Sequence, residues 1–257
     1  MDTPQTSNSA VSAPRIERVR HELKRRSLTV TAIERITPGM LRMQLSGDDL
    51  SDFVSLAPDD HIKVLVPGAG EEMERRDYTP RRYDTDARTL VLDFAIHEAG
   101  PATQWALDAA VGDRLEIGGP RGSAVISSDI ENWLLIGDET ALPAIGRRIE
   151  EAGAGMNITA IAAVADAAER QAFQTEAKLD MHWAYRPLSQ ATDASALMNV
   201  LQSVDLLLGT FVWIAAEASV MRALRSYLVE ERSYPLSWIK ASGYWVKGKA
   251  DTTEKFD

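Results

Sequence analysis

The hydrophobic pattern of the chain changes once, near Ser127, and this change limits the possible folds more than any single motif. Before it, apolar and polar residues alternate in short runs, with turn signals such as Thr37-Pro38-Gly39 between them. A period of two over four to eight residues is typical of half-buried β-strands. The alternating runs lie at 28–32, 41–45, 62–66, 89–97 and 115–117. Short antiparallel strands at this spacing predict a small β-barrel.

After Ser127, apolar strands alternate with amphipathic helices. The predicted units are a strand, turn and helix at 131–153, a strand at 157–166 with a helix at 167–177, a strand at 181–187 with a helix at 193–204, a strand and longer helix at 210–231, and a last strand at 235–245. Alternation of this kind predicts a doubly wound parallel sheet. We therefore expect three parts: a flexible tail at 1–20, a β-barrel domain at 21–126 and an α/β domain at 127–257.

Composition and charge exclude several classes of partner. The 257 residues carry a formal net charge of −10, which disfavours nucleic acid because phosphate backbones would be repelled. The absence of cysteine excludes disulfides and a thiolate-bound iron–sulfur cluster, and the four histidines show no metal-ligand spacing, so we expect no bound metal. No apolar tract is long enough to span a bilayer, and no signal-peptide core opens the chain. A cytoplasmic monomer without membrane insertion is the expectation.

One stretch, from Arg76 to Trp105, combines several residues suited to holding a cofactor. Arg76 offers a planar phosphate donor, Tyr78 a ring that can lie against a flat heterocycle, and Thr79 a hydroxyl that donates and accepts. Gly100-Pro101 indicates a helix start, and a helix N-terminus beside an arginine favours an anion. Taken alone, His97 or Trp105 would fit a position in the hydrophobic core better than a cofactor contact.

The same stretch resembles the siderophore-interacting FAD-binding family, a branch of the ferredoxin-reductase-like flavoproteins. The resemblance lies in Arg76-x-Tyr78-Thr79 and in the sequence HEAGPATQWA, followed by three later motifs in the family's order. Those motifs are GPRGS at 119–123, GDETALPAI at 137–145 and GYWVKG at 243–248. The resemblance implies a six-stranded flavin-binding barrel followed by a nicotinamide-binding α/β domain.

The resemblance also implies the cofactors FAD and NADPH or NADH and a set of residues that hold them. Thr79 would act at the reactive edge of the flavin ring and is the one catalytic assignment. The other implied cofactor-binding residues are Arg76, Asp77, Tyr78, Asp93, His97, Gly100, Pro101, Ala102, Thr103, Gly137, Asp138, Glu139, Thr140, Glu217 and Trp245. The turn at Gly137 is not the GxGxxG fingerprint, so without the barrel it would read as an ordinary capped loop. Trp245 would equally fit a role in closing the domain core.

Three basic residues match the cationic pocket of the family: Lys63, Arg121 and Lys240. A chain with a charge of −10 must concentrate cations to hold an anionic ferric siderophore. Each residue taken alone would be read as a solvated surface charge. Together they are our predicted substrate-binding residues.

The function that the resemblance implies is reduction of ferric siderophores with electrons from NAD(P)H. Two alternatives stay open: a flavin or electron-transfer reductase with another acceptor, and a FAD- or siderophore-binding protein without turnover. The coenzyme also stays open. Arg170, Arg222 and Arg225 would suit the 2′-phosphate of NADPH, whereas Asp166 and Glu169 would suit the free ribose hydroxyl of NADH. We expect NADPH.

Overall fold

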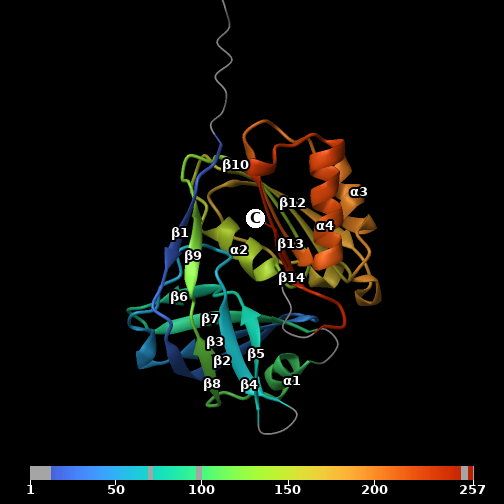
Figure 1. Ribbon diagram of the computed structural model, residues 1–257. Coiled ribbons are helices and arrows are strands. Elements are labelled where there is room, and N and C mark those ends of the chain that lie inside the picture. The colour runs from blue at the N-terminus through green and yellow to red at the C-terminus, as the bar shows by residue number, and fades with distance from the viewer. Residues whose placement is uncertain (1–12, 69–71, 97–99, 250–253, 257) are drawn as a thin grey trace, which may run out of the picture.

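The computed structural model describes residues 13–68, 72–96, 100–249 and 254–256. The predicted architecture is confirmed: an antiparallel, barrel-like sheet is followed by a mainly parallel sheet flanked by helices (Figure 1). Each sheet has its own apolar core. None of the helices in the described part of the chain is both long and apolar enough to cross a membrane.

The barrel-like sheet has the strand order β5-β4-β8-β2-β3-β7-β6. Its strands are β2 (Arg25–Thr37), β3 (Met40–Ser46), β4 (Ile62–Pro67), β5 (Met73–Tyr78), β6 (Arg82–Asp84), β7 (Thr89–Ala95) and β8 (Arg114–Gly118). The described residues thus form seven strands in this sheet, one more than the six expected. Five of the strands coincide with the alternating runs of the sequence, although β7 ends at Ala95 and residue 97 of its run lies outside the described residues. The charged strand β5 and the three-residue strand β6 lie outside those runs, because neither has an apolar period of two.

Part of the segment predicted as a flexible tail is a strand. In the described residues, β1 (Ile16–Arg20) pairs antiparallel with β9 (Gly122–Ile126), forming a separate two-stranded ribbon. The side chains of β1 are mostly exposed, so the alternation that marks a half-buried strand is absent from its sequence. The backbone pairing with β9, which is distant in sequence, supplies the order instead.

The second sheet has the order β12-β11-β10-β13-β14-β15. Its strands are β10 (Asn132–Gly137), β11 (Asn157–Val164), β12 (Lys178–Tyr185), β13 (Thr210–Glu217), β14 (Ile239–Trp245) and the antiparallel β15 (Glu254–Phe256). Helix α2 (Leu142–Glu150) lies on one face, whereas α3 (Ser195–Ser203) and α4 (Ala218–Ser226), followed by a π-helical turn at Tyr227–Glu231, lie on the other (Figure 1). The first, central strand β10 is flanked by β11 and β13, as in a doubly wound sheet.

The helix predicted at 167–177 is wrong. The structure has a single 3-10 turn there, Ala167–Glu169, and an irregular segment up to β12. Two tertiary contacts hold the segment in this form. The Glu169 carboxylate accepts hydrogen bonds from the barrel, and the Phe173 ring packs so closely on α2 that a Cβ at Gly146 would lie 2.7 Å from it. Helix propensity is a weak preference that such contacts override.

The two sheets are joined by a polar and an apolar interface. Arg147 of α2, only 3% exposed, donates to the Ser55 hydroxyl at 2.7 Å, to the Ser55 carbonyl at 3.0 Å and to the Pro80 carbonyl at 3.0 Å. Arg81 of the barrel pairs with Glu150 at 2.6 and 2.8 Å. A small apolar cluster containing Met40 of β3 and Leu142 of α2 lies at the same junction.

Candidate active site

The barrel's contribution begins at β5, where Arg76, Tyr78 and Thr79 follow one another at the strand's end. The Arg76 guanidinium is held by Glu74 and by the Arg75 carbonyl at 2.8 Å. Thr79 is 7% exposed. The ring of Tyr78 lies 4.4 Å from the ring of Phe94, and burial raises the pKa of the Tyr78 phenol, which therefore stays neutral. The strand thus sets a guanidinium, a ring and a hydroxyl in sequence along one edge.

Asp93 on β7 has a structural partner that its sequence position did not reveal. Its carboxylate takes two hydrogen bonds of 2.7 Å from Arg42, and Arg81 lies 3.6 Å away. Both carboxylate oxygens are therefore turned to arginines, and the predicted contact with the flavin stays a prediction. His97, predicted from the same strand face, lies outside the described residues.

Helix α1 (Pro101–Asp108) starts beside β4 and β5, and no side chain of the described residues caps its first amides. Gly100 is its N-cap and supplies no side chain, and the first turn contains no acidic residue. The first intrahelical bond runs from the Gln104 amide to the Gly100 carbonyl, so the amides of Ala102 and Thr103 lack an intrahelical acceptor. Such a terminus favours a phosphate.

A cavity of about 460 Å³ lies at this helix start. Its lining comes from the end of β4 and from α1: Pro67, Gly68, Gly100, Pro101, Gln104, Trp105 and Asp108. A Cβ at Gly100 would meet no other atom within 4 Å, so the backbone there is open to a ligand. The uncapped amides and the cavity fit a diphosphate group. Arg76 and Tyr78 lie further along β5, opposite Val64 and Ile62 of β4, whereas the cavity borders the Pro67 end of β4.

At the other sheet, Asp138 links the carboxyl ends of three parallel strands, β10, β13 and β14, by hydrogen bonds. Only 1% exposed, it follows Gly137 at the end of β10. One carboxylate oxygen accepts from the Thr140 amide at 3.0 Å and the Thr140 hydroxyl at 2.6 Å. The other accepts from the Glu217 amide at 2.8 Å and the Trp245 indole N–H at 3.0 Å. The predicted residues Asp138, Thr140, Glu217 and Trp245 therefore form one hydrogen-bonded group.

Two further carboxylates lie at this edge, and their pKa values are shifted in opposite directions. Burial and the nearby charge of Asp138 raise the pKa of Glu139 to about 7, although Arg186 at 3.0 Å opposes the shift. Burial also acts to raise the pKa of Glu217, but hydrogen bonds from Ser219, Lys247 and Val220 outweigh it and lower the pKa. Glu217 caps α4, with its carboxylate 2.6 Å from the Ser219 amide. Its side chain thus supports the edge from within the fold.

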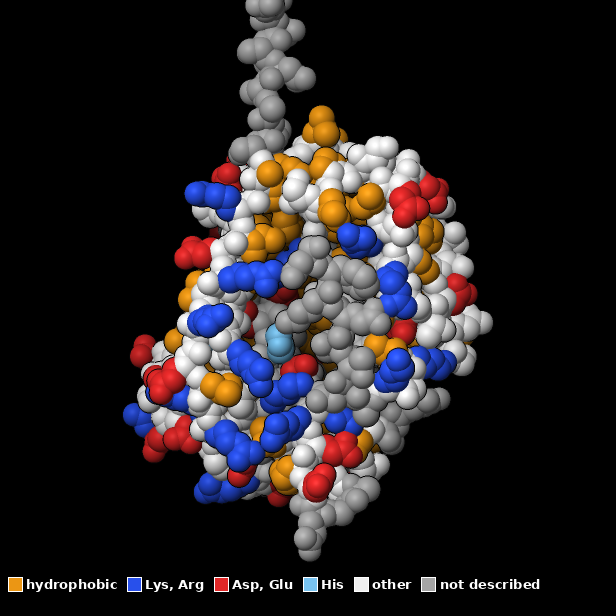
Figure 2. Space-filling view, in the orientation of Figure 1, with side chains coloured by type: hydrophobic (Ala, Val, Ile, Leu, Met, Phe, Trp, Pro, Cys, Tyr) orange, Lys and Arg blue, Asp and Glu red, His pale blue; other side chains and the backbone are white. Residues whose placement is uncertain are grey.

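The three predicted substrate-binding cations belong to segments that border residues 59–63. Lys240 on β14 reaches Asp59 at 2.7 Å, whereas Lys63 is in β4 and pairs with Asp77 of β5 at 3.0 Å. Arg121 is exposed and follows the turn at Gly119, where an added Cβ would lie 3.2 Å from the Arg121 amide nitrogen and 3.9 Å from the His61 carbonyl. The face drawn in Figure 2 shows Lys and Arg side chains gathered over the barrel and the hollow above it.

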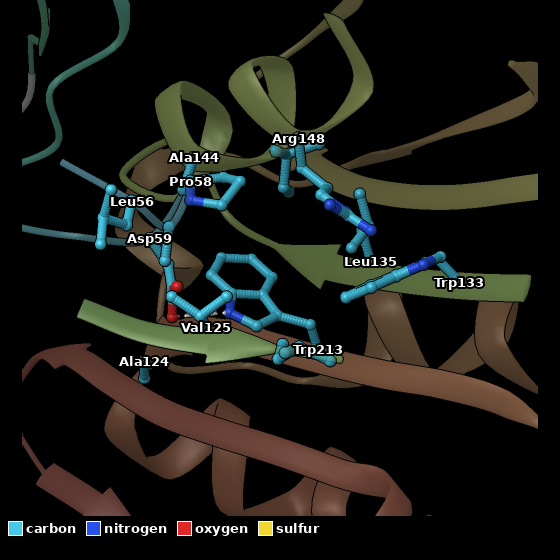
Figure 3. A pocket seen from close by; sticks show the side chains of 13 residues that line it. Leu56, Pro58, Asp59, Ala124, Val125, Trp133, Leu135, Ala144, Arg148 and Trp213 are labelled. Atoms are coloured by element: carbon cyan, nitrogen blue, oxygen red, sulfur yellow. Dashed lines mark hydrogen bonds between the residues drawn. The ribbon is translucent and has the colours of Figure 1, made fainter. Parts of the chain in front are cut away.

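A second cavity, about 80 Å³ in volume, separates the loop before β4 from the parallel sheet. Figure 3 shows Asp59 and Pro58 on one side and Arg148 and Trp133 on the other, with Trp213 between them. The Trp213 indole donates to Asp59 at 3.1 Å, and the Arg148 guanidinium lies 3.7 Å above the Trp133 ring. Burial lowers the pKa of Arg148 to about 10.

Sequence reasoning missed the contacts that connect the two halves of this site. Glu169 accepts from the Thr37 hydroxyl at 2.6 Å and the Gly39 amide at 2.8 Å, so its carboxylate faces the barrel instead of a ribose. Asp59 and Arg147 lie outside the sequence motifs that carry the resemblance. Their partners come from the other domain, and a one-dimensional pattern carries no signal for such a contact.

The whole arrangement matches solved structures over nearly its full length. A siderophore utilization protein from T. fusca superimposes with a TM-score of 0.85 at 33% identity, covering 93% of this chain and 98% of that chain. The siderophore-interacting protein SipS from Aeromonas hydrophila has the same fold, with a TM-score of 0.76 at 24% identity over 90% of this chain and 93% of that chain. Residues 29–124 match the siderophore-interacting FAD-binding domain, and residues 130–248 match the siderophore-interacting protein family.

The chain belongs to the siderophore-interacting FAD-binding family. Within this family it is 32% identical over 250 residues to the NADPH-dependent ferric-chelate reductase of Escherichia coli, covering 89% of this chain and 96% of that protein. It is 26% identical over 237 residues to the ferric vibriobactin reductase of Vibrio cholerae, covering 83% of this chain and 86% of that protein. The two matched regions contain all of the predicted site residues.

Proposed function

We propose that the protein reduces ferric siderophores, using FAD as its bound cofactor and NADPH as its electron donor. The observation that supports the proposal is that Lys63, Arg121 and Lys240 belong to segments bordering residues 59–63, between a flavin-type barrel and a nicotinamide-type sheet edge. A pocket with lysine and arginine side chains at such a junction suits a large ferric chelate. The reductase relatives support the same reaction class.

In this mechanism the chain positions groups and does little chemistry itself. When bound, FAD supplies a ring that accepts two electrons from a nicotinamide and passes them on singly. The amides at the start of α1, with Arg76, would hold its diphosphate, and Tyr78 would lie beside its ring. The Thr79 hydroxyl would offer a hydrogen bond at the ring's reactive edge. These roles remain proposals.

The sheet edge around Asp138 would receive the nicotinamide. Asp138 fixes the Thr140 turn and the Trp245 indole by hydrogen bonds of 3.0 Å or less, so the edge is preorganised before the coenzyme arrives. Glu169 is engaged by the barrel and is not turned to a ribose hydroxyl, which supports NADPH over NADH. Arg170 contacts Tyr185, with its guanidinium 5.2 Å from the ring centre.

Release of iron follows from the change in oxidation state. Hard oxygen ligands bind Fe(III) far more strongly than Fe(II), so a reduced chelate dissociates without an acid or base at the metal. We further propose that the reaction takes place in the cytoplasm, where NADPH is available. We also propose that one chain suffices, since both halves of the site belong to it.

An anaerobic titration tests the proposal. FAD-loaded protein should lose its yellow colour on addition of NADPH and regain it on addition of a ferric siderophore, with Fe(II) appearing in proportion. A flavin that NADPH cannot bleach would indicate a binding protein without turnover. Bleaching without reoxidation by any ferric chelate would indicate a reductase with another acceptor. Parallel titration with NADH measures the coenzyme preference.

A further inference from the structure

Two of the three cations in the proposed siderophore pocket already have a carboxylate partner. Lys240 lies 2.7 Å from Asp59, and Lys63 lies 3.0 Å from Asp77. If the side chains of Lys63 and Lys240 had no carboxylate partner, they and Arg121 would together present three positive charges to a ligand. The paired arrangement presents far less net charge to a ligand.

Asp59 is fixed in place on both sides. Its carboxylate oxygen accepts from the Trp213 indole at 3.1 Å as well as from Lys240, and the Asp59 side chain is only 15% exposed. Trp213 and Lys240 are neighbours in register on β13 and β14, so both project toward Asp59 from the same face of the sheet. Figure 3 shows Asp59 reaching the Trp213 indole across the domain junction. This counter-ion is therefore part of the fold and not a chance surface contact.

Asp77 is held by its strand in the same way. It lies directly opposite Lys63 in the register of β5 and β4, so the pair is set by backbone pairing. The Asp77 side chain is 22% exposed, and one of its oxygens is buried without a hydrogen-bond partner in the structure. A buried carboxylate oxygen without a donor favours the nearest cation strongly.

Asp60 and Arg148 are two further charged groups close to Asp59. Asp60 is 3% exposed and accepts from the hydroxyls of Ser55 and Ser123, and neither neutralises its charge. Arg148 belongs to the cavity next to Asp59 and stacks on Trp133. The exposed Arg121 is the cation of the three for which the described residues record no carboxylate partner.

We propose that Asp59 and Asp77 are specificity-determining residues that fit the pocket to ferric chelates of little or no net charge, such as trishydroxamates, in preference to trianionic triscatecholates. The inference rests on the proposed siderophore-reductase function. Three hydroxamates neutralise Fe(III), whereas three catecholates leave three negative charges. A neutral chelate has no net Coulomb interaction with the two carboxylates. A trianion is repelled by each carboxylate, in proportion to the charge of the chelate.

Binding without turnover tests the inference. The probes are Ga(III) complexes of a trishydroxamate and a triscatecholate, which keep the charge and shape of the ferric complexes and cannot be reduced. Their affinity for FAD-loaded protein is measured by quenching of tryptophan fluorescence, without NADPH. Asp59→Asn and Asp77→Asn keep the side-chain shape, and flavin absorbance reports whether FAD stays bound. One charge about 7 Å from a trianion in a solvent-exposed pocket changes its affinity about tenfold.

Each variant should therefore raise the affinity ratio of triscatecholate to trishydroxamate about tenfold. The matched control is Asp180→Asn, which removes one exposed carboxylate from β12, at the opposite edge of the parallel part of the sheet. It makes the same change in net charge and should leave the ratio within about twofold. A ratio that moves equally in all three variants, or in none, overturns the inference.

If a variant folds poorly, the salt dependence of triscatecholate binding to the unmodified protein tests the same inference. With the lysines neutralised, triscatecholate affinity should fall only weakly as salt is raised, whereas three free cations would give a steep decline. A steep decline contradicts the inference. These binding results are separate from the proposed function, which fails if NADPH does not bleach the flavin or if no ferric chelate reoxidises the reduced protein.

Discussion

Replacing Asp138 by Asn should damage the sheet edge out of proportion to the change of one atom. The carboxylate accepts four hydrogen bonds, two on each oxygen, from Thr140, Glu217 and Trp245. An asparagine can turn only one oxygen to these donors, so two N–H or O–H groups then face its NH₂. Hydrogen bonds to a charged group contribute about 1.5–3 kcal/mol each, and two of them are lost. We therefore expect Asp138→Asn to lower the free energy of unfolding by about 3–6 kcal/mol.

The assay combines urea unfolding with steady-state kinetics. The Michaelis constant for NADPH should rise at least about tenfold, since the Thr140 turn and Trp245 lose their common anchor. The matched control is Asp193→Asn before α3, where the exposed carboxylate accepts the Ser195 amide hydrogen at 2.9 Å. It should cost about 1 kcal/mol. An Asp138→Asn protein within 1 kcal/mol of the unmodified protein, with an unchanged Michaelis constant, would refute this reasoning.

Three further outcomes are expected. Because Glu139 has a folded-state pKa of about 7 against an ordinary 4.5, its contribution to stability is full below pH 4.5 and is lost as the pH rises to 7. The melting temperature of Glu139→Gln minus that of the unmodified protein should therefore increase as the pH rises across that range. If the two plots of melting temperature against pH run parallel, the raised pKa of Glu139 is contradicted. Arg147→Met should cost about 3–5 kcal/mol in urea unfolding because it leaves the Ser55 and Pro80 carbonyls without their donor, whereas the exposed Arg82→Met should stay within about 0.5 kcal/mol. Alanine at Lys63, Arg121 and Lys240 together should raise the Michaelis constant for anionic ferric chelates while FAD absorbance is retained; unchanged kinetics would remove these residues from the pocket.

The sequence predicted the strands of the fold best where one face is buried. The alternating runs at 28–32 and 41–45 became β2 and β3, because burying every second side chain leaves a period of two. The sequence-based prediction failed where a segment is held in place by residues that are distant in the sequence. The exposed strand β1 and the irregular segment after Glu169 are fixed by β9 and by the barrel turn at Gly39, and neither contact leaves a local pattern.

In the candidate site, too, the sequence located residues within motifs but not their contacts with distant segments. Motifs located Asp138, Thr140 and Trp245, and the structure joins them by hydrogen bonds. The partner of Asp93 and the counter-ion of Lys240 were beyond prediction, because they depend on which strands and domains become neighbours. The Arg76 and Thr79 roles toward FAD stay predictions.

The ion pair between Asp59 and Lys240 also limits how the protein can be recombined. Asp59 precedes β4 in the barrel, and Lys240 lies on β14 of the other domain. A chimera that takes its barrel from one relative and its parallel sheet from another would inherit the lysine and the carboxylate from different parents. Where a parent lacks one partner, the hybrid would carry an unbalanced charge at the mouth of its site. Domain exchange within this family should therefore transfer positions 59 and 240 as a pair.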